Sequence, residues 1–285
     1  MGSEMCIRDS PLLRCHYCNF TQTQPPKCPE CSSPYFRFFG SGTQRVIEEL
    51  SRQFPDLRVL RFDSDTTRRK GAHRELLDRF AAGEADLMVG TQMLTKGIDL
   101  PQVRFVGVLA ADSLLNLPDF RASERTFQTL LQVAGRAGRG EHPGQVILQT
   151  YNPDHPVILA VQRYAYETTV ELELQQRDTL QYPPYGQLVV LRLSSPNEEQ
   201  VEQTAQSIAT YLAAEIEALD FEVAVLGPAP ANILRVARRY RWQVLLKLPP
   251  TVNGMPAWTL PISDLQAQCP KDVRLSIDVD PLTLL

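Results

Sequence analysis

The 285-residue sequence lacks several features that would each assign it to a class of protein. It has no run of about 18 apolar residues that could cross a membrane, and no apolar segment behind a basic start that would act as a signal peptide. It also has no G-x-x-x-x-G-K-[ST] phosphate loop and no adjacent Asp-Glu pair. The first two absences predict a cytoplasmic protein without a membrane partner. The last two exclude a P-loop nucleotide-binding lobe from this stretch of chain.

Cysteine is scarce, and most of it gathers in one place. Four of the six cysteines form a C-x2-C-x9-C-x2-C pattern, at Cys15, Cys18, Cys28 and Cys31. Thiolates three residues apart can turn onto one Zn²⁺ at about 2.3 Å, and four of them complete a tetrahedral structural site. Disulfides are the alternative, which a cytoplasmic location disfavours. The spacing therefore predicts zinc-binding knuckles over residues 11–40.

The net charge of the chain is small, but its charged residues are grouped in blocks of one sign. The net charge is -4, yet residues 193–234 contain seven acidic residues and no Lys or Arg, whereas residues 235–247 contain five basic residues and no acidic one. In this basic block arginines alternate with aromatic residues in what we expect to be a hairpin. Arginines bind phosphates and aromatic rings stack on unpaired bases, which suits single-stranded or forked DNA. The expected DNA contacts are Arg238, Arg239, Arg241 and Trp242. A charged turn with solvated arginines and a buried Trp242 is the alternative.

From Gly42 onward the pattern alternates between helix and strand. Apolar spacing predicts helices near residues 43–54, behind a Thr43 cap, and near 76–80 and 121–134. Strands are expected at residues 57–62, 87–89, 103–110 and 146–148. Strands separated by helices imply a parallel sheet covered on both faces, so residues 41–155 are predicted to be an α/β domain. A long helix over residues 156–182 is expected to follow as a link.

Pro183 and Pro184 mark a boundary, after which the pattern changes. A strand at residues 188–193 and an amphipathic helix at 201–219 are followed by further strands at 223–226, 233–237, 242–248 and 273–279. Residues 183–285 are therefore predicted to be a small α+β domain, with one or two helices on about five strands. Residues 1–10 do not read like the rest. They resemble a translated sequencing adapter, so we expect a non-native leader on the C-terminal part of a longer protein.

One helix end carries a glutamine and two arginines, in the run Gln132-Val133-Ala134-Gly135-Arg136-Ala137-Gly138-Arg139. On a helix, Gln132 lies one turn before Arg136, and Arg136 shares a face with Arg139. A guanidinium with fixed donors suits a phosphoryl group in transfer, and such an arginine finger contributes ~10³ to 10⁵ in rate. An ordinary helix end closed by Gly140 is the alternative.

The loop after the strand at residues 87–89 has the composition of a phosphate-backbone contact. It reads Gly90-Thr91-Gln92-Met93-Leu94-Thr95-Lys96-Gly97-Ile98-Asp99. Backbone amides, hydroxyls and a lysine hold a phosphate backbone without reading bases. Asp99 is suited to a ribose hydroxyl, and Gly97 permits a sharp turn. Sites in parallel sheets gather at the carboxyl ends of strands, where this loop begins.

These two segments resemble motifs V and VI of the second motor lobe of superfamily 2 helicases. The resemblance extends from Leu13 to Pro281 and indicates the primosomal protein N′ family of replication-restart helicases. The further segments that carry it, besides the cysteine pairs, are Phe62–Thr67, Asp119–Arg125, Tyr182–Tyr185 and Ile277–Pro281. The implied architecture is zinc knuckles, a RecA-like second helicase lobe with a parallel sheet, and a small α+β C-terminal domain.

The resemblance also implies an activity and partners. The family restarts stalled forks as ATP- and Mg²⁺-dependent 3′-to-5′ DNA helicases and loads the replicative helicase with primosome proteins. Gln132, Arg136 and Arg139 would face the γ-phosphate of ATP on a first lobe, and Gly97 and Asp99 the nucleotide. Thr91, Gln92 and Lys96 would lie near the tracking strand.

Two departures from the family pattern carry expectations of their own. Because this chain has no phosphate loop, we expect that by itself it does not hydrolyse ATP. The family binds two zinc ions with eight cysteines, whereas the four present here are expected to close on one ion. A non-catalytic DNA- or primosome-binding module is the alternative function.

Overall fold

The computed structural model describes residues 12–14, 21–23, 27, 32, 42–95, 100–138, 143–217, 222–250 and 258–284. The described residues divide into two compact units. The parallel-sheet unit comprises Arg37–Leu117 and Ala122–Thr169, and the antiparallel-sheet unit comprises Met1–Phe36, Pro118–Arg121 and Val170–Leu285. Each unit has its own hydrophobic core. No helix of the described residues is both long and apolar enough to cross a bilayer.

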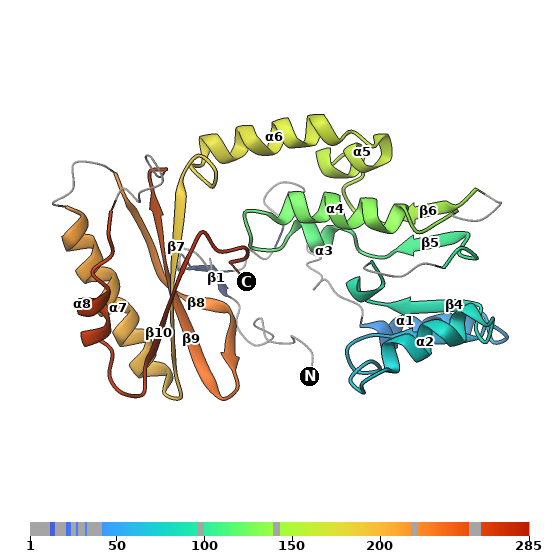
Figure 1. The fold of residues 1–285 in the computed structure, drawn as a ribbon, viewed down its shortest axis with the longest axis horizontal. Helices are drawn as coiled ribbons and strands as arrows, with labels where there is room; N and C mark the ends of the chain where they lie inside the picture. Colours follow the sequence, from blue (N-terminus) through green and yellow to red (C-terminus); the bar gives the residue numbers. More distant parts are fainter. Residues whose placement is uncertain are drawn as a thin grey trace. The chain divides into compact units, whose positions relative to one another are not determined.

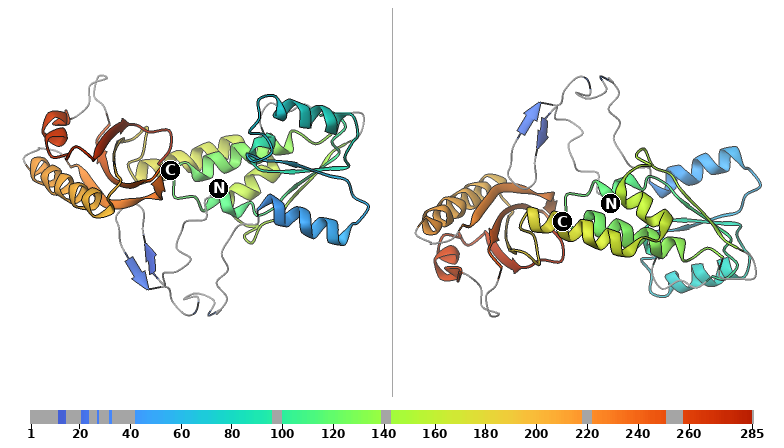
Figure 2. Two further views of the ribbon diagram at one scale, coloured as in Figure 1. Left: turned by 90° about the horizontal axis from the view of Figure 1, so that it is seen from below. Right: turned by 90° about the horizontal axis from the view of Figure 1, so that it is seen from above.

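Helices alternate with short strands in the parallel-sheet unit. Strand β3 (Val59–Phe62) pairs in parallel with β4 (Leu87–Gly90), and β5 (Phe105–Val108) pairs in parallel with β6 (Gln145–Leu148). Helices α1 (Thr43–Gln53) and α2 (Ala72–Ala81) flank the first pair from opposite sides (Figure 2). The expected parallel pairing is confirmed. In the described part of the chain it forms two separate pairs, not one continuous sheet.

Helix α4 (Ala122–Ala134) packs on the second strand pair through its apolar stripe. Phe127 and Leu130 are buried in a core that includes Ile158 of α5 (Pro156–Arg163). The helix expected at residues 121–134 is therefore confirmed to within one residue. Two short elements were not expected, the 3-10 turn η1 (Gln92–Thr95) and helix α3 (Asp112–Leu115).

The single linking helix expected over residues 156–182 is wrong, because the chain forms two helices there, α5 and α6 (Tyr166–Thr179). Tyr164 takes a left-handed conformation with φ of 51°. The N–H of Ala165 then donates to the carbonyl of Ala160 at 2.9 Å, the bond that closes a Schellman-type helix end. Apolar spacing continues across this break, so periodicity alone does not reveal it.

The antiparallel-sheet unit contains a four-stranded sheet in the order β10-β7-β9-β8. Its strands are β7 (Gln187–Ser195), β8 (Ala224–Val236), β9 (Arg239–Leu248) and β10 (Arg274–Val279). The expected strands at 223–226 and 233–237 are one strand, β8, whose pairing with β9 shifts register twice. Its prolines are tolerated because β8 is an edge strand. A separate antiparallel pair is formed by β1 (Leu12–Arg14) and β2 (Thr21–Thr23).

One face of the four-stranded sheet carries the main core. Helices α7 (Glu198–Ile216) and α8 (Ile262–Ala267) lie on this side (Figure 1). The side chains that alternate towards α7 are apolar and buried, among them Leu191, Leu193 and Trp242. Asn197 caps α7 by accepting a hydrogen bond from the N–H of Gln200 at 3.2 Å.

The C-terminal tail and residues 118–121 pack on part of the opposite face. Leu188, Val190 and Leu245 pack there against Leu284. The buried carboxylate of Asp119 accepts hydrogen bonds from the hydroxyl of Thr283 at 2.9 Å and the N–H of Leu284 at 3.1 Å. In the sequence, residues 118–121 lie between α3 and α4, yet they belong to the antiparallel-sheet unit.

Candidate functional site

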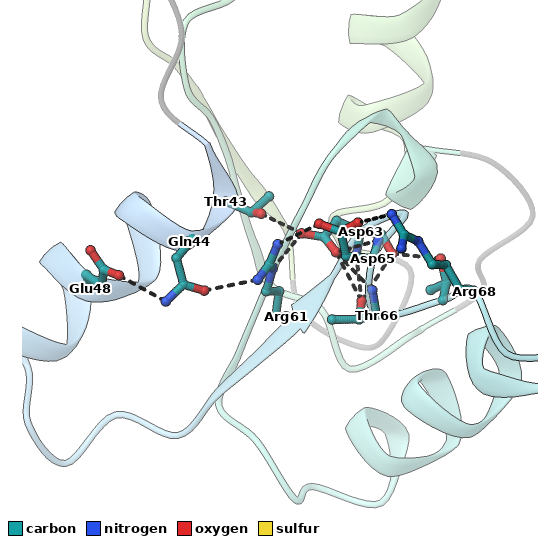
Figure 3. Close-up of polar contacts among 9 residues, drawn as sticks. Thr43, Gln44, Glu48, Arg61, Asp63, Asp65, Thr66 and Arg68 are labelled. Carbon is teal, nitrogen blue, oxygen red and sulfur yellow. Dashed lines mark hydrogen bonds and ion pairs between the residues drawn. The ribbon is translucent and has the colours of Figure 1, made fainter. Parts of the chain in front are cut away.

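Asp63 organises the turn at the carboxyl end of β3 (Figure 3). Its buried carboxylate accepts hydrogen bonds from the Thr43 hydroxyl at 2.6 Å and the Arg61 guanidinium at 2.5 Å, and from the backbone N–H groups of Asp65 and Thr66 at 3.1 Å each. Thr43 is thus not the cap expected for α1. Gly42 occupies the N-cap position, and the Thr43 hydroxyl ties the first turn of the helix to the strand end.

These contacts determine the chemistry of Asp63. Burial raises the pKa of its carboxyl, but the hydrogen bonds from Thr43, Arg61 and Thr66, with the charge of Arg61, outweigh that effect and lower the pKa to about 2. A carboxylate with so low a pKa is a poor proton acceptor at neutral pH. Asp63 therefore acts as an anchor for the turn and not as a general base.

Asp112, which the sequence pattern did not single out, anchors the carboxyl end of the second strand pair in the same way. It is buried, and it accepts hydrogen bonds from the Thr150 hydroxyl at 2.8 Å and the Tyr151 N–H at 3.0 Å. Burial raises the pKa of Asp112, but these hydrogen bonds lower it further than burial raises it. Its signal in the sequence is only its position a few residues after an apolar strand.

The segment expected to contact DNA begins at Gly90, where β3 comes unusually close. A side-chain Cβ at Gly90 would lie 2.3 Å from the carbonyl oxygen of Phe62, so only glycine fits beside this strand. Thr91 and Gln92 follow at once and are exposed at the carboxyl end of the β3–β4 pair. Lys96, Gly97 and Asp99 lie outside the described residues.

Gln132 and Arg136 come from different local structures, which corrects the expectation that one helix presents them together. Gln132 is exposed on α4, whereas α4 ends at Ala134 and Arg136 lies in the turn beyond it, half-buried. The N–H of Arg136 donates to the carbonyl of Val133 at 3.0 Å, a tighter spacing than that of an α-helix. Arg139 lies outside the described residues.

The turn that carries Arg136 is fixed to the amino end of the second strand pair. The N–H of Gly138 donates to the carbonyl of Val103, just before β5, at 3.1 Å. Gly138 has a φ of +73°, and a Cβ on it would lie 2.2 Å from the nitrogen of Gly144, which immediately precedes β6. The backbone segment leading from the expected Asp99 site into β5 is thereby hydrogen-bonded to the arginine turn. The expected DNA contacts Thr91 and Gln92 lie instead at the carboxyl end of the first pair.

A second candidate site lies on the antiparallel sheet. The expected hairpin is confirmed, since β8 and β9 are joined by Ala237 and Arg238, both with positive φ. Because side chains alternate between faces, Arg239 and Arg241 point away from α7. Arg192 and Arg274 from the neighbouring strands lie on the same face, since Ser194 pairs with both Arg241 and Arg274. All four arginines line a shallow pocket of about 350 Å³.

Trp242 does not fit the DNA-stacking role expected for it. It is 3% exposed and belongs to the core beneath α7, because its position in β9 turns it to the face opposite Arg241. Arg235 lies on that face too, with its guanidinium 4.8 Å from the ring centroid of Tyr240. Arg238 is exposed at the hairpin turn. The side chains of the basic block at residues 235–247 are thus divided between the two faces of the sheet. Arg192 and Arg274 join Arg239 and Arg241 on the face opposite α7.

The predicted zinc ligands Cys15, Cys18, Cys28 and Cys31 lie outside the described residues. Among the residues that the structure describes, no group of three or more histidine, cysteine, aspartate or glutamate side chains is arranged to hold a metal ion.

Comparison with known proteins assigns both units to a class. Residues 36–141 match the helicase conserved C-terminal domain, and residues 178–282 match the primosomal protein N C-terminal domain. The first match covers the β3–β4 pair, β5 and the arginine turn, and ends just before β6. The chain therefore contains the C-terminal domain of a helicase, followed by a domain found in primosomal proteins.

The particular family follows from individual relatives. The chain is 60% identical over 274 residues to replication restart protein PriA of Synechocystis, covering 96% of this chain and 32% of that protein. Identity is 43% to replication restart protein PriA of Bacillus subtilis, with 96% and 34% covered, and 37% to that of Treponema pallidum, with 96% and 41% covered. The chain is homologous to the C-terminal part of replication restart protein PriA, which confirms the family inferred from the sequence. It spans between about a third and two fifths of the length of these relatives.

Replacing Gly138 by alanine tests the close approach that fixes the arginine turn. We expect the variant to accelerate hydrogen exchange at the amide of residue 138 by about tenfold or more, because the new Cβ cannot coexist with the nitrogen of Gly144. Gly83→Ala is the matched control, since Gly83 also has positive φ, +77°, but open space around it. Equal changes at the two sites would show that only backbone strain is involved.

The Asp63 network predicts a pH dependence. The folded-state pKa of about 2 lies below the ordinary value of 3.8, so the stabilisation is complete above about pH 4 and is lost as pH falls towards 2. Carbon-detected NMR titration is expected to place the Asp63 carboxyl near 2, and Asp63→Asn is expected to remove this part of the acid dependence of unfolding. Titration near 4 would contradict the network.

Proposed function

We propose that the chain is the C-terminal part of an ATP-dependent 3′-to-5′ DNA helicase that restarts stalled replication forks. In this proposal Arg136 and Arg139, with Gln132 beside them, face the γ-phosphate of an ATP bound on another lobe. Gly97 and Asp99 contact the nucleotide, while Thr91, Gln92 and Lys96 contact the DNA strand. Magnesium is held with the ATP by residues of that other lobe, because the carboxylates of Asp63 and Asp112 already accept hydrogen bonds from the turns that they anchor.

The observation that carries the proposal is the hydrogen bond from Gly138 to Val103, at 3.1 Å. This hydrogen bond holds the turn that contains Arg136 against the backbone a few residues after Asp99. Arg136 and Asp99 are distant in the sequence, and both are expected to contact the same nucleotide. Fixed guanidinium groups stabilise charge in phosphoryl transfer without proton transfer of their own.

The proposal extends to cofactor, location and partners. Zn²⁺ is bound by Cys15, Cys18, Cys28 and Cys31, a donor set of four thiolates that suits a closed structural site. The protein acts in the cytoplasm on forked or single-stranded DNA, with Arg238, Arg239 and Arg241 in contact with it. Primosome proteins and the replicative helicase are its protein partners.

Arg136→Ala tests the role of the arginine turn in the longer protein encoded at this locus, once the upstream reading frame has been read from flanking genomic DNA. We expect DNA-stimulated ATP turnover to fall ~10³-fold in kcat with KM for ATP changed far less, because the guanidinium acts on the transition state. The 285-residue chain alone is expected to show no turnover. Turnover by this chain, or an upstream frame without a phosphate loop, would favour the alternative of a silent binding module.

Metal analysis tests the knuckles. We expect one zinc ion per chain, and loss of it in a Cys28→Ser, Cys31→Ser double variant, because two thiolates cannot complete a tetrahedral site. Cys269→Ser is the control, since Cys269 is a free thiol in a different part of the chain. Zinc near zero in the unaltered protein would refute the site.

A further inference from the structure

The basic face of the antiparallel sheet has more positive charge than its own carboxylates neutralise. Four guanidinium groups line the pocket, and one of them, Arg192, forms an ion pair with Asp278, whose Oδ2 lies 3.3 Å from its Nη1. Arg239 is held by uncharged partners, since it donates to the carbonyls of Ser194 and Asp272 at 2.6 Å each. These contacts orient Arg239 and leave its charge available to a ligand.

Arg192 and Arg241 also lie close enough for their charges to act on each other. Besides its ion pair with Asp278, Arg192 donates through Nη2 to the carbonyl of Thr283 at 3.0 Å, whereas its Nε is buried without a hydrogen-bond partner among the described residues. Burial lowers the pKa of Arg241, and the charge of neighbouring Arg192 lowers it further. Like charges held together in a partly dry site repel each other, so an anion bound between them would stabilise the cluster.

The pocket is shaped for an extended anion. Arg241 and Arg274 lie on either side of Ser194 in paired strands, which separates their backbones by about 10 Å, two strand spacings. Arg274 and Ser276 are exposed, so the pocket is open along the sheet. A row of separated guanidinium groups with serine hydroxyls between them suits successive phosphates of a backbone better than one enclosed small ion.

We propose that this pocket binds the phosphodiester backbone of single-stranded DNA, with Arg192 and Arg274 as phosphate ligands beside Arg239 and Arg241. The inference rests on the proposed function for its choice of ligand and adds two residues from outside the basic sequence block. Binding here is independent of sequence, because the aromatic side chains of the hairpin, Tyr240 and Trp242, pack on the other face.

Substitution on the two faces of the sheet tests the proposal in the 285-residue chain. Arg274→Gln and, separately, Arg241→Gln are expected to weaken binding of a fluorescent single-stranded oligonucleotide about tenfold. The slope of log affinity against log salt is expected to fall by ~0.7 for each phosphate that the variant no longer binds. Arg235→Gln is the matched control, because it removes the same charge from the opposite face near the hairpin and is expected to leave affinity within about twofold.

Two further ligands test whether the pocket binds the DNA backbone or any anion. An oligonucleotide of the same sequence with a neutral methylphosphonate backbone is expected not to bind, and inorganic phosphate is expected to compete only weakly. Tight Arg274-dependent binding of phosphate alone, or of an acidic peptide in place of DNA, would overturn the proposal. Equal losses of affinity in the Arg235 and Arg274 variants would reduce it to general electrostatics, and unchanged affinity in the Arg241 and Arg274 variants would refute it.

Folding of each variant is checked within the same unit. Both tryptophans of the chain, Trp242 and Trp258, pack in the core of the antiparallel sheet, so their fluorescence reports on this unit alone. The Arg274 result is also separate from the proposed function, which does not include Arg274 among its DNA contacts. ATP turnover of the longer protein depends on Arg136, whereas the pocket is tested by DNA binding of a chain that is expected not to hydrolyse ATP.

Discussion

The alternation of side chains along β7 and β9 is the constraint on which the antiparallel unit depends. Leu191 and Leu193 on one strand and Trp242 on the next enter the core, and a shift of register by one residue would exchange them with Arg192 and Arg241. Moving so many apolar groups to solvent would cost far more than the few kcal/mol by which a domain is stable. The energy that fixes the core therefore also fixes which arginines share the opposite face.

In the parallel-sheet unit, buried carboxylates fix the turns at the strand ends. Asp63 and Asp112 each lie just beyond a strand, and each is saturated by hydroxyl and backbone donors. A buried carboxylate that lacked these donors would be costly, so the turns and the carboxylates stabilise one another. The loops that begin at these strand ends start from fixed positions, although the loops themselves are rich in small and polar residues.

The sequence predicted the features that follow from local periodicity and motif spacing. Helix α4, the parallel strands and the β8–β9 hairpin appear where apolar spacing and turn chemistry place them. The break at Tyr164 was missed because a left-handed tyrosine leaves no mark on apolar spacing. Arg192 and Arg274 were missed because they meet Arg241 only through pairing between strands far apart in the sequence. Trp242 was misread because a run of arginines and aromatics does not reveal which face each side chain takes.

The arginine turn ends in a contact between two glycines that has a consequence for how this part of the molecule can vary. A Cβ on Gly138 would lie 2.2 Å from the backbone of Gly144, and a Cβ on Gly144 would lie 2.3 Å from the backbone next to Gly138. No side chain is small enough to serve as an intermediate at either position. The distance between α4 and β6 therefore cannot be tuned by successive substitutions of increasing size. Evolution can still vary the number of residues between the two glycines, which the contact itself leaves unconstrained.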